Sequence, residues 1–392
     1  TAIHQSGPAM NQPLPLRGLR VIEYSHMVMG PSCGLIFADL GAEVIKVEPA
    51  PHGDNGRRLK GAGAGFFVGF NRNKKSFMVD LNSTQGLEAV RKLVTTADVF
   101  LENFRPGALT AKGLDYESLA RLNPRLVYCS LKGFLSGPYE NRTALDEVAQ
   151  MMTGLAYMTG PPGRPLRAGA PVNDMMGGLF GALAVLAALR ERDLTGKGEH
   201  VQSGLFENSA YLVSTHMLQH AVSGVAPPPM PAGNRAWGVY DVFESSDGIA
   251  IFIGVVTDRQ WEIFTDRLHE PALRDPVYAT NNDRVQARPT LIPLVASLVR
   301  QFSIVELEQL CESAGLPFGR VNTPSDLFDD PHLNAGGMVS LPLPDGNTVR
   351  APGLPIQFGA LRPGLRSGPP APGAHNQEIL RELGLAPDSS DA

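Results

Sequence analysis

The chain has 392 residues, of which 43% are hydrophobic and 19% are charged, and its formal net charge is −5. These values are typical of a soluble globular protein long enough to form more than one domain. A weakly acidic chain has no general attraction for nucleic acid, so we expect no nucleic-acid partner.

The cysteines indicate a reducing compartment. Cys33, Cys129 and Cys311 lie far apart and form neither a disulfide framework nor a metal-ligand spacing. The stretch TAIHQSGPAMNQ lacks a secretory signal pattern, and no uncharged apolar run reaches the roughly 18 residues of a membrane span. We therefore expect a cytoplasmic protein without a metal site or a membrane partner.

Short β-branched runs alternate with helical patterns in the first third of the chain. The predicted strands are 19–25, 42–48, 75–81, 98–104 and 125–134, and the predicted helices are 31–41, 83–97 and 115–123. This alternation favours an α/β fold with a Rossmann-like open parallel sheet. Such sheets bind ligands beyond the carboxyl ends of their strands. The loops expected there are 25–30, 102–109 and 130–134.

The rest of the chain has a different pattern. Residues 145–192 have a helical pattern, and the Pro- and Gly-rich stretch 226–235 reads as a boundary. A hairpin is predicted around Ser245–Gly248. Near the C-terminus, 361–374 is predicted to be an extended arm, followed by an amphipathic helix over 375–385.

Asp174 stands at the head of the apolar helical run GLFGALAVLAAL. An aspartate at this position is ordinarily a helix N-cap. It is also a candidate nucleophile, because the helix dipole and free N–H groups would hold its carboxylate ionised. Gly177 and Gly178 would then allow a bulky ligand to approach the first turn.

Several polar residues follow predicted strands and have both a structural and a functional interpretation. His26 lies in the first ligand-facing loop, and Asn103 and Arg105 lie in the second. The basic cluster of Arg72, Lys74 and Lys75 and the separate Lys132 are either solvated surface or phosphate-binding groups. No GxGxxG or GxxxxGK[ST] pattern occurs in the first βαβ unit, so nicotinamide and P-loop functions are disfavoured.

Six motifs occur in a family-like order. They are LRGLRVIEYSHMVMGPSCGLIFADLGAEVIKVEP, NRNKKSFMVDL, LENFRPGAL, VYCSLKGF, AGAPVNDMMGGLFGALAVLAAL and TGKGEHV. Together they resemble CoA-transferase family III, also called CaiB/BaiF, over residues 13–385.

The resemblance implies a catalytic mechanism. Asp174 would attack an acyl-CoA thioester, form a mixed anhydride and then an aspartyl-CoA thioester, and pass CoA to an acceptor acid. Coenzyme A would be part of the substrate and not a permanently bound cofactor. An apolar pocket would keep water from the anhydride. A small dicarboxylate such as succinate is the expected acid.

The resemblance also implies CoA contacts and an assembly. The expected CoA-contacting residues are His26, Met27, Val28, Met29, Lys75, Asn103, Phe104 and Lys132, with Arg105, Lys112, Gly177 and Gly178 as further candidates. Family members are interlocked homodimers of a large Rossmann-like domain and a smaller α+β domain. The corresponding large domain is 13–205 with 336–392, the small domain is 225–325, and the linkers are 206–224 and 326–335.

The sequence departs from the family pattern at several points. Pro49 and Ala111 replace basic residues that contact the adenosine end of CoA in some members, and Lys112 is a candidate substitute. The stretch PAGNRAWG lacks the glycine-rich loop of the oxalate enzymes. Leu145 stands where the related α-methylacyl-CoA racemases carry a catalytic histidine. A racemase, an intramolecular CoA transfer and a non-catalytic CoA-binding protein remain as alternatives.

Overall fold

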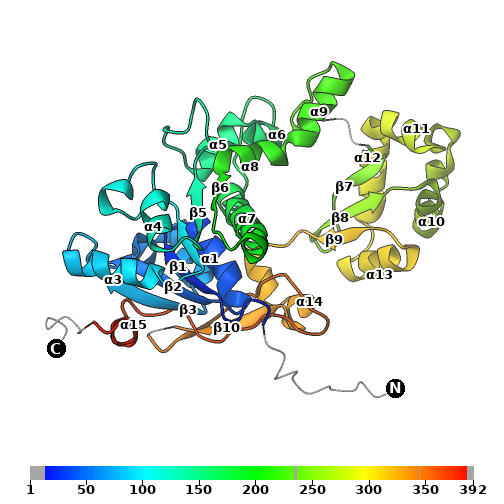
Figure 1. The fold of residues 1–392 in the computed structure, drawn as a ribbon. Coiled ribbons are helices and arrows are strands. Elements are labelled where there is room, and N and C mark those ends of the chain that lie inside the picture. Colours follow the sequence, from blue (N-terminus) through cyan, green and yellow to red (C-terminus); the bar gives the residue numbers. More distant parts are fainter. Residues whose placement is uncertain (1–13, 234–235, 344, 386–392) are drawn as a thin grey trace. The chain divides into compact units, whose positions relative to one another are not determined.

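The computed structural model describes residues 14–233, 236–343 and 345–385 (Figure 1). The chain folds as two compact units, Thr1–Pro231 with Pro331–Ala392, and Ala232–Asp330. Pro13, residues 386–392 of the expected large domain and residues 234–235 of the expected boundary lie outside the described residues. Residues 206–224, the expected linker, fall in helices α8 (Leu205–Leu212) and α9 (Ser214–Ser223), which belong to the first unit.

The first unit is built on a six-stranded parallel sheet in the order β3-β2-β1-β4-β5-β6. Its strands are β1 (Arg20–Tyr24), β2 (Glu43–Pro49), β3 (Lys74–Val79), β4 (Val99–Glu102), β5 (Val127–Lys132) and β6 (His200–Gly204). The first five match the sequence prediction, whereas β6 was not predicted because its polar HVQSG sequence lacks a β-branched run. The strand order reverses between β1 and β4, and open sheets bind ligands at such switch points.

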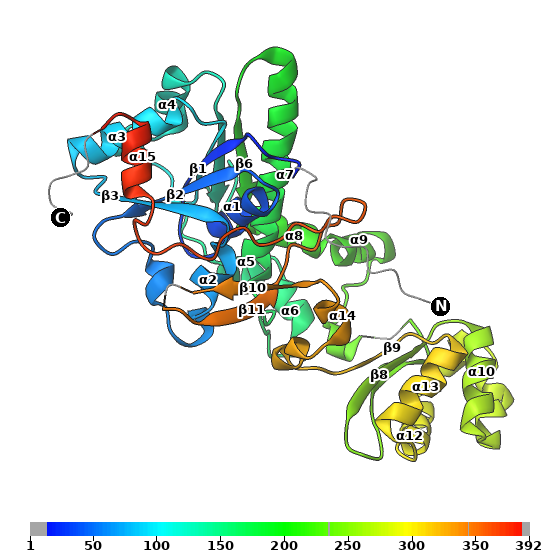
Figure 2. The same cartoon turned by 90° about the horizontal axis from the view of Figure 1, so that it is seen from below.

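Helices cover both faces of this sheet. The helices α1 (Met29–Asp39) and α7 (Val172–Thr195) pack on one face, while α3 (Thr84–Val94), α4 (Tyr116–Leu122) and α15 (Asn376–Glu382) pack on the other (Figure 2). Adjacent strand residues alternate between the two cores, so Val21 faces α1 and α7 while Ile22 faces the opposite layer. Both side chains are fully buried, and burial of each contributes about 1.5–3 kcal/mol.

Helix α7 has 24 residues and is strongly apolar in composition. By length and composition alone it could cross a membrane, although the uncharged apolar runs in the sequence are shorter. One side of the helix, including Ala182 and Val185, is buried against the sheet and α1. A core helix of a globular protein has the same properties, so α7 carries no argument for a membrane span.

The remaining parts of the first unit surround the sheet. They are α2 (Phe66–Phe70), α5 (Asp146–Met152), α6 (Leu155–Thr159), α14 (Pro331–Asn334) and the hairpin β10 (Met338–Pro342)–β11 (Thr348–Pro352). The arm 361–374 is extended apart from a single bridge and a turn, and hydrogen bonds attach it to the sheet edge. Asn73 N donates to Ser367 O at 3.0 Å, and Gly373 N donates to Ser76 Oγ at 2.8 Å.

The second unit is a three-stranded antiparallel sheet with its own core. The strands are β7 (Val239–Glu244), β8 (Ala250–Val255) and β9 (Phe318–Arg320), and the helices are α10 (Asp258–Leu268), α11 (Asn281–Gln286), α12 (Arg288–Val299) and α13 (Ile304–Ala314). The hairpin predicted around Ser245–Gly248 joins β7 to β8. Phe264, Leu291 and Leu307 are fully buried in this core.

Candidate active site

Asp174 lies in the first turn of α7, and a carboxylate from another helix caps that turn. The N-cap position is occupied by Pro171, which provides no side-chain cap. Asp146 of α5 fills this role, because its Oδ2 accepts hydrogen bonds from Asn173 N at 2.8 Å and Asp174 N at 3.0 Å. Asp174 is therefore not the N-cap, and its own carboxylate remains available for chemistry.

The environment of Asp174 opposes ionisation, contrary to the expectation from the helix dipole. Burial, followed by the charges of Asp146 and Glu147, raises the pKa of Asp174 to about 7, and only Arg167 acts in the opposite direction. The N–H groups expected to stabilise the Asp174 anion are bound by Asp146 instead. Asp174 is thus a weakly solvated carboxylate whose ionisation falls near neutral pH, a property common at catalytic positions.

Gly177 and Gly178 are packed against α1 and do not leave space for a ligand, so that expectation is wrong. A Cβ on Gly177 would lie 2.3 Å from Met29 Cε, and one on Gly178 would lie 2.2 Å from Ser32 Oγ. The two glycines instead allow close contact between helices. This contact places the start of α1, and with it the loop 26–29, beside the first turns of α7.

The loop 26–29 is held by the loop that follows β4. Asn103 Oδ1 accepts a hydrogen bond from His26 N at 3.0 Å, and Asn103 Nδ2 donates to His26 O at 2.9 Å. The Phe104 ring lies 5.1 Å from the His26 ring, measured between centroids. Met27 has a φ of +65°, a left-handed conformation that costs a side-chain-bearing residue about 1 kcal/mol or more. The strained backbone directs Met27 outward, where it is 36% exposed.

The four loop residues do not all face outward. Val28 and Met29 are buried in the protein, whereas His26 is half-buried and Met27 is exposed. Burial lowers the pKa of His26, and the nearby Asp54 opposes that effect. His26 and Met27 are therefore the members of this loop that a ligand can contact most readily.

Lys132, at the end of β5, joins this group. Its Nζ donates to Glu102 Oε1 at 2.6 Å and to Phe104 O at 2.9 Å. Arg105 and Lys132 both line a cavity of about 160 Å³ that also includes Ser130. The structure thus brings together His26, Asn103, Phe104, Arg105 and Lys132 at the carboxyl edge of β1, β4 and β5.

Lys75 does not join them. It lies near the amino end of β3, and its Nζ pairs with Glu43 at 2.6 Å and Glu378 at 2.7 Å. The expected CoA contact fails because the amino ends of parallel strands lie at the edge of the sheet opposite to the ligand loops.

Arg72 and Lys74, the other members of that basic cluster, are buried and not solvated. Lys74 Nζ pairs with Glu23 Oε2 at 2.7 Å and donates to Pro31 O at 2.9 Å. Lys46 Nζ contacts the other Glu23 oxygen at 3.0 Å and donates to Ser25 O at 2.9 Å. These contacts attach both ends of the ligand loop, through Ser25 and Pro31, to a buried ion network.

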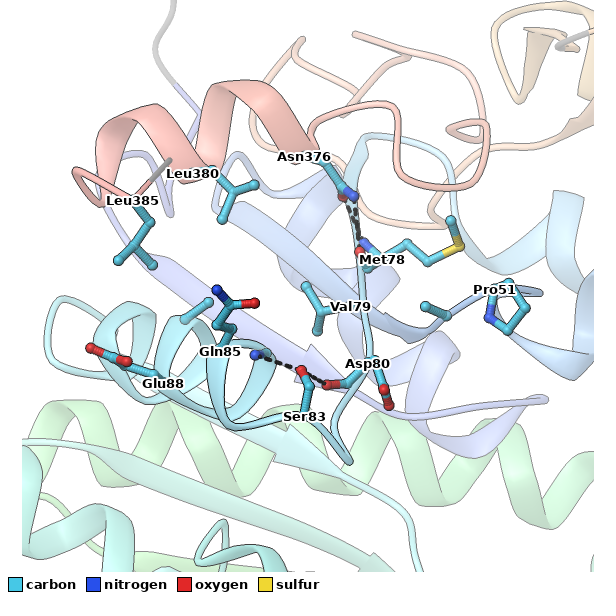
Figure 3. Close-up of a pocket in the computed structure, with 13 residues that line it drawn as sticks. Pro51, Met78, Val79, Asp80, Ser83, Gln85, Glu88, Asn376, Leu380 and Leu385 are labelled. Atoms are coloured by element: carbon cyan, nitrogen blue, oxygen red, sulfur yellow. Dashed lines mark hydrogen bonds between the residues drawn. The ribbon is translucent and has the colours of Figure 1, made fainter. Parts of the chain in front are cut away.

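A second cavity lies beyond the end of β3, between α3 and α15, and has a volume of about 470 Å³ (Figure 3). Its wall includes Pro51, Val79, Asp80, Ser83 and Leu380. Figure 3 shows Ser83 beside Asp80 at the start of α3, and Asn376 of α15 bonded to Met78.

Lys112 lies next to this cavity. Its Nζ donates to Leu81 O at 3.1 Å and to Asn82 Oδ1 at 2.9 Å, directly before the α3 N-cap Ser83. The structure therefore gives Lys112 a position near a carboxyl-edge cavity, although separate from the His26 group.

The sequence motifs do not point to Asp146 or Arg167. Asp146 follows Leu145 in the stretch LDEVAQ, and Arg167 lies in the stretch PLRAG. These charged residues in the segment before Asp174 are the signal that could have identified them. Arg167 pairs with Glu147 of α5. The next residue, Ala168, is also attached to α5, because its N donates to Gln150 Oε1 at 2.8 Å.

The chain is similar to known proteins along most of its length. The model of CoA-transferase family III matches residues 16–376. Succinate–glutarate CoA-transferase of Agrobacterium fabrum is 34% identical, covering 95% of this chain and 96% of that protein. Succinyl-CoA–D-citramalate CoA-transferase of Chloroflexus aurantiacus is 32% identical over 96% of each protein.

Two solved structures have a similar fold. A CaiB/BaiF family protein from Brucella suis is 35% identical and has a TM-score of 0.85, covering 95% of this chain and 100% of that chain. Rv3272 from Mycobacterium tuberculosis is 28% identical with a TM-score of 0.81, covering 94% and 100%. The resemblance seen in the motifs is confirmed, and the chain belongs to CoA-transferase family III and is a CoA-transferase.

Proposed function

We propose that this enzyme moves CoA between small dicarboxylic acids and that Asp174 carries the acyl and CoA groups between them. The observation that carries the proposal is the position of Asp174, in the first turn of α7 beside the His26 loop, with a pKa raised to about 7 by burial and neighbouring carboxylates. A poorly solvated carboxylate is a better nucleophile than one surrounded by water. The succinate, glutarate and citramalate in the relatives' names support dicarboxylic acids as the substrate class.

The reaction proceeds by exchange between thioesters and anhydrides. An Asp174 oxygen attacks the thioester carbonyl carbon, the C–S bond breaks and CoA leaves as a thiolate. The thiolate then attacks the aspartyl carbonyl carbon of the mixed anhydride and releases the donor acid as a carboxylate. An aspartyl-CoA thioester remains on the enzyme.

The second half of the reaction reverses these steps with a different acid. The acceptor carboxylate attacks the aspartyl thioester and displaces the thiolate, and the thiolate attacks the acceptor acyl carbon of the new anhydride. Asp174 is regenerated as a carboxylate and a new acyl-CoA leaves. One thioester is consumed and one is formed, so the cycle needs no external energy source.

The bound CoA follows the carboxyl edge of the sheet in this proposal. His26 and Met27 contact the thioester end, and Asn103, Phe104 and Lys132 line the route of the pantetheine. The cavity between α3 and α15 accepts the nucleotide end of CoA. Lys112, the basic residue that follows Ala111, lies beside this cavity. CoA enters and leaves as part of the substrates.

The active enzyme is proposed to be an interlocked homodimer in the cytoplasm. An apolar surface supports an interface, because α7 exposes Leu179 at 54% and Leu183 at 58%, and α9 exposes Met217 at 62% and Val222 at 88%. Large apolar side chains left exposed on a monomer often mark an interaction surface.

Trapping the covalent intermediates tests the proposal. Purified protein is incubated with succinyl-CoA or glutaryl-CoA without an acceptor acid and then treated with hydroxylamine or borohydride. Peptide mass spectrometry should find the modification on Asp174, and none in Asp174→Ala. An unmodified Asp174 with deuterium exchange at the acyl α-carbon would instead indicate a racemase, although the exposed Leu145 provides no acid or base.

A further inference from the structure

Arg167 is the basic side chain whose charge favours the ionisation of Asp174, and two neighbouring carboxylates oppose it. Asp146 and Glu147 lie close enough to Asp174 to oppose its ionisation, whereas Arg167 favours it. A substrate with a second carboxylate would add another negative charge to this region. A positive charge near Asp174 would offset the added negative charge. Among the described residues, Arg167 is the basic group that acts on Asp174.

The guanidinium of Arg167 is partly fixed and partly open. Its Nε donates to Ala168 O at 2.9 Å, and its Nη1 pairs with Glu147. Among the residues described, Nη2 has no hydrogen-bond partner. The Arg167 side chain is 39% exposed and that of Glu147 is 46% exposed, so a solute can reach both groups.

The backbone around Arg167 is attached to the helices that carry the active site. Ala168 N donates to Gln150 Oε1 at 2.8 Å, and Gln150 Nε2 donates to Asp146 Oδ1 at 2.5 Å. Asp146 in turn binds the N–H groups at the start of α7. A chain of three residues therefore fixes the position of Arg167 relative to Asp174.

We propose that Arg167 binds the second carboxylate of a dicarboxylic substrate while the first carboxyl group reacts at Asp174. The proposal rests on the transferase function proposed above and adds the residue that selects the substrate class. The planar guanidinium matches a carboxylate with two parallel hydrogen bonds, and a second carboxylate can share it with Glu147 or replace Glu147. A monocarboxylic acid of the same length has no group to pair there.

Competition between acceptor acids tests this role without interference from the earlier steps. One acyl-CoA donor that the enzyme accepts is supplied with an equimolar mixture of glutarate and pentanoate, which have equal chain lengths. Both acids react with the same aspartyl-CoA intermediate, so the ratio of glutaryl-CoA to pentanoyl-CoA reports only their relative kcat/KM. Changes in the ionisation of Asp174 or in donor turnover cancel from this ratio.

The wild-type enzyme should favour glutarate, and Arg167→Gln should lower the product ratio by about 10- to 100-fold. Arg167→Lys should restore part of the preference, because it keeps the charge and loses the fork. Arg164→Gln is the matched control, since Arg164 is an exposed arginine three residues away with no effect on Asp174. It should leave the ratio unchanged.

Two results would overturn the proposal. A wild-type ratio near one, or an Arg167→Gln ratio equal to that of the wild type with a lower total rate, would limit Arg167 to an electrostatic effect on Asp174. The absence of any CoA transfer by the wild type with every donor tested would instead reject the transferase function itself. The two failures are therefore distinguishable in the same assay.

Discussion

Asp146 caps the helix that carries Asp174 and at the same time opposes the ionisation of Asp174. Its Oδ2 lies 3.0 Å from Asp174 N, and its charge is the largest effect on the Asp174 pKa after burial. One carboxylate thus stabilises the start of α7 and keeps the neighbouring carboxylate reactive. The relationship predicts how activity depends on pH.

The rate should rise with pH as Asp174 loses its proton, because only the carboxylate attacks the thioester. We expect log(kcat/KM) to increase up to about pH 7 and then reach a plateau. Asp146→Asn removes the negative charge and keeps one capping acceptor, so the rise should move to lower pH. Glu147→Gln should move it less, because Glu147 is the smaller effect, and Arg167→Gln should move it to higher pH.

Initial rates with one donor–acceptor pair between pH 5 and 9 measure these profiles. A profile that stays in place in all three variants would show that another group controls the pH dependence.

Asp174 should also reduce the stability of the protein above neutral pH. Its pKa is about 7 in the folded protein and 3.8 as an isolated group, so the folded state binds the proton more tightly. Stability should therefore fall as pH rises from about 4 to 7, by roughly 4 kcal/mol in total. Asp174→Asn removes this cost, so its unfolding free energy should exceed that of the wild type at pH 8.

Urea denaturation at pH 4 and pH 8 checks the sign. The gain from Asp174→Asn should be present at pH 8 and largely absent at pH 4, where the wild-type carboxyl is protonated in the folded state and about half protonated in the unfolded state. Equal effects at the two pH values would contradict the raised pKa.

The strand–helix alternation in the sequence predicted most of the first unit, because buried parallel strands are made of mostly apolar runs such as VIEY and VFLE. The site was predicted less completely. Asn103 and Lys132 could be found because they lie at the carboxyl ends of strands, whereas Asp146 contacts Asp174 only through tertiary packing across 28 residues. Gly177 and Gly178 were recognised as important but were assigned to a ligand, since a sequence does not show which neighbour a glycine approaches.

Gly178 should not tolerate even one added carbon. A Cβ there would lie 2.2 Å from Ser32 Oγ and 2.9 Å from both Cys33 N and Met29 O, and the last two are backbone atoms that cannot move easily. Gly178→Ala should cost about 1–3 kcal/mol of stability and raise the KM for acyl-CoA, because it separates α1 from α7. Gly69→Ala in α2 is the control: its Cβ meets nothing within 4 Å, so stability should be unchanged or slightly higher. Denaturation and steady-state kinetics on both variants measure the difference, and equal behaviour would contradict the packing role.

Lys74 should stabilise the ligand loop through its buried pair with Glu23. Burial lowers the pKa of Lys74 to about 8, and the Glu23 charge counteracts that effect. Lys74→Met would leave Glu23 with only Lys46 as a charged partner in a site without solvent, at a cost of about 3–5 kcal/mol. It would also remove the hydrogen bond to Pro31 O, so the KM for acyl-CoA should rise.

The double variant Lys74→Met/Glu23→Leu should recover part of the stability, because it removes the unpaired charge, but it should not recover the KM. Lys75→Met is the matched control, since its pairs with Glu43 and Glu378 are partly exposed and exposed pairs contribute about 1 kcal/mol or less. If Lys75→Met destabilised the protein as much as Lys74→Met, or if the double variant regained a normal KM, the buried network would not be what positions the loop.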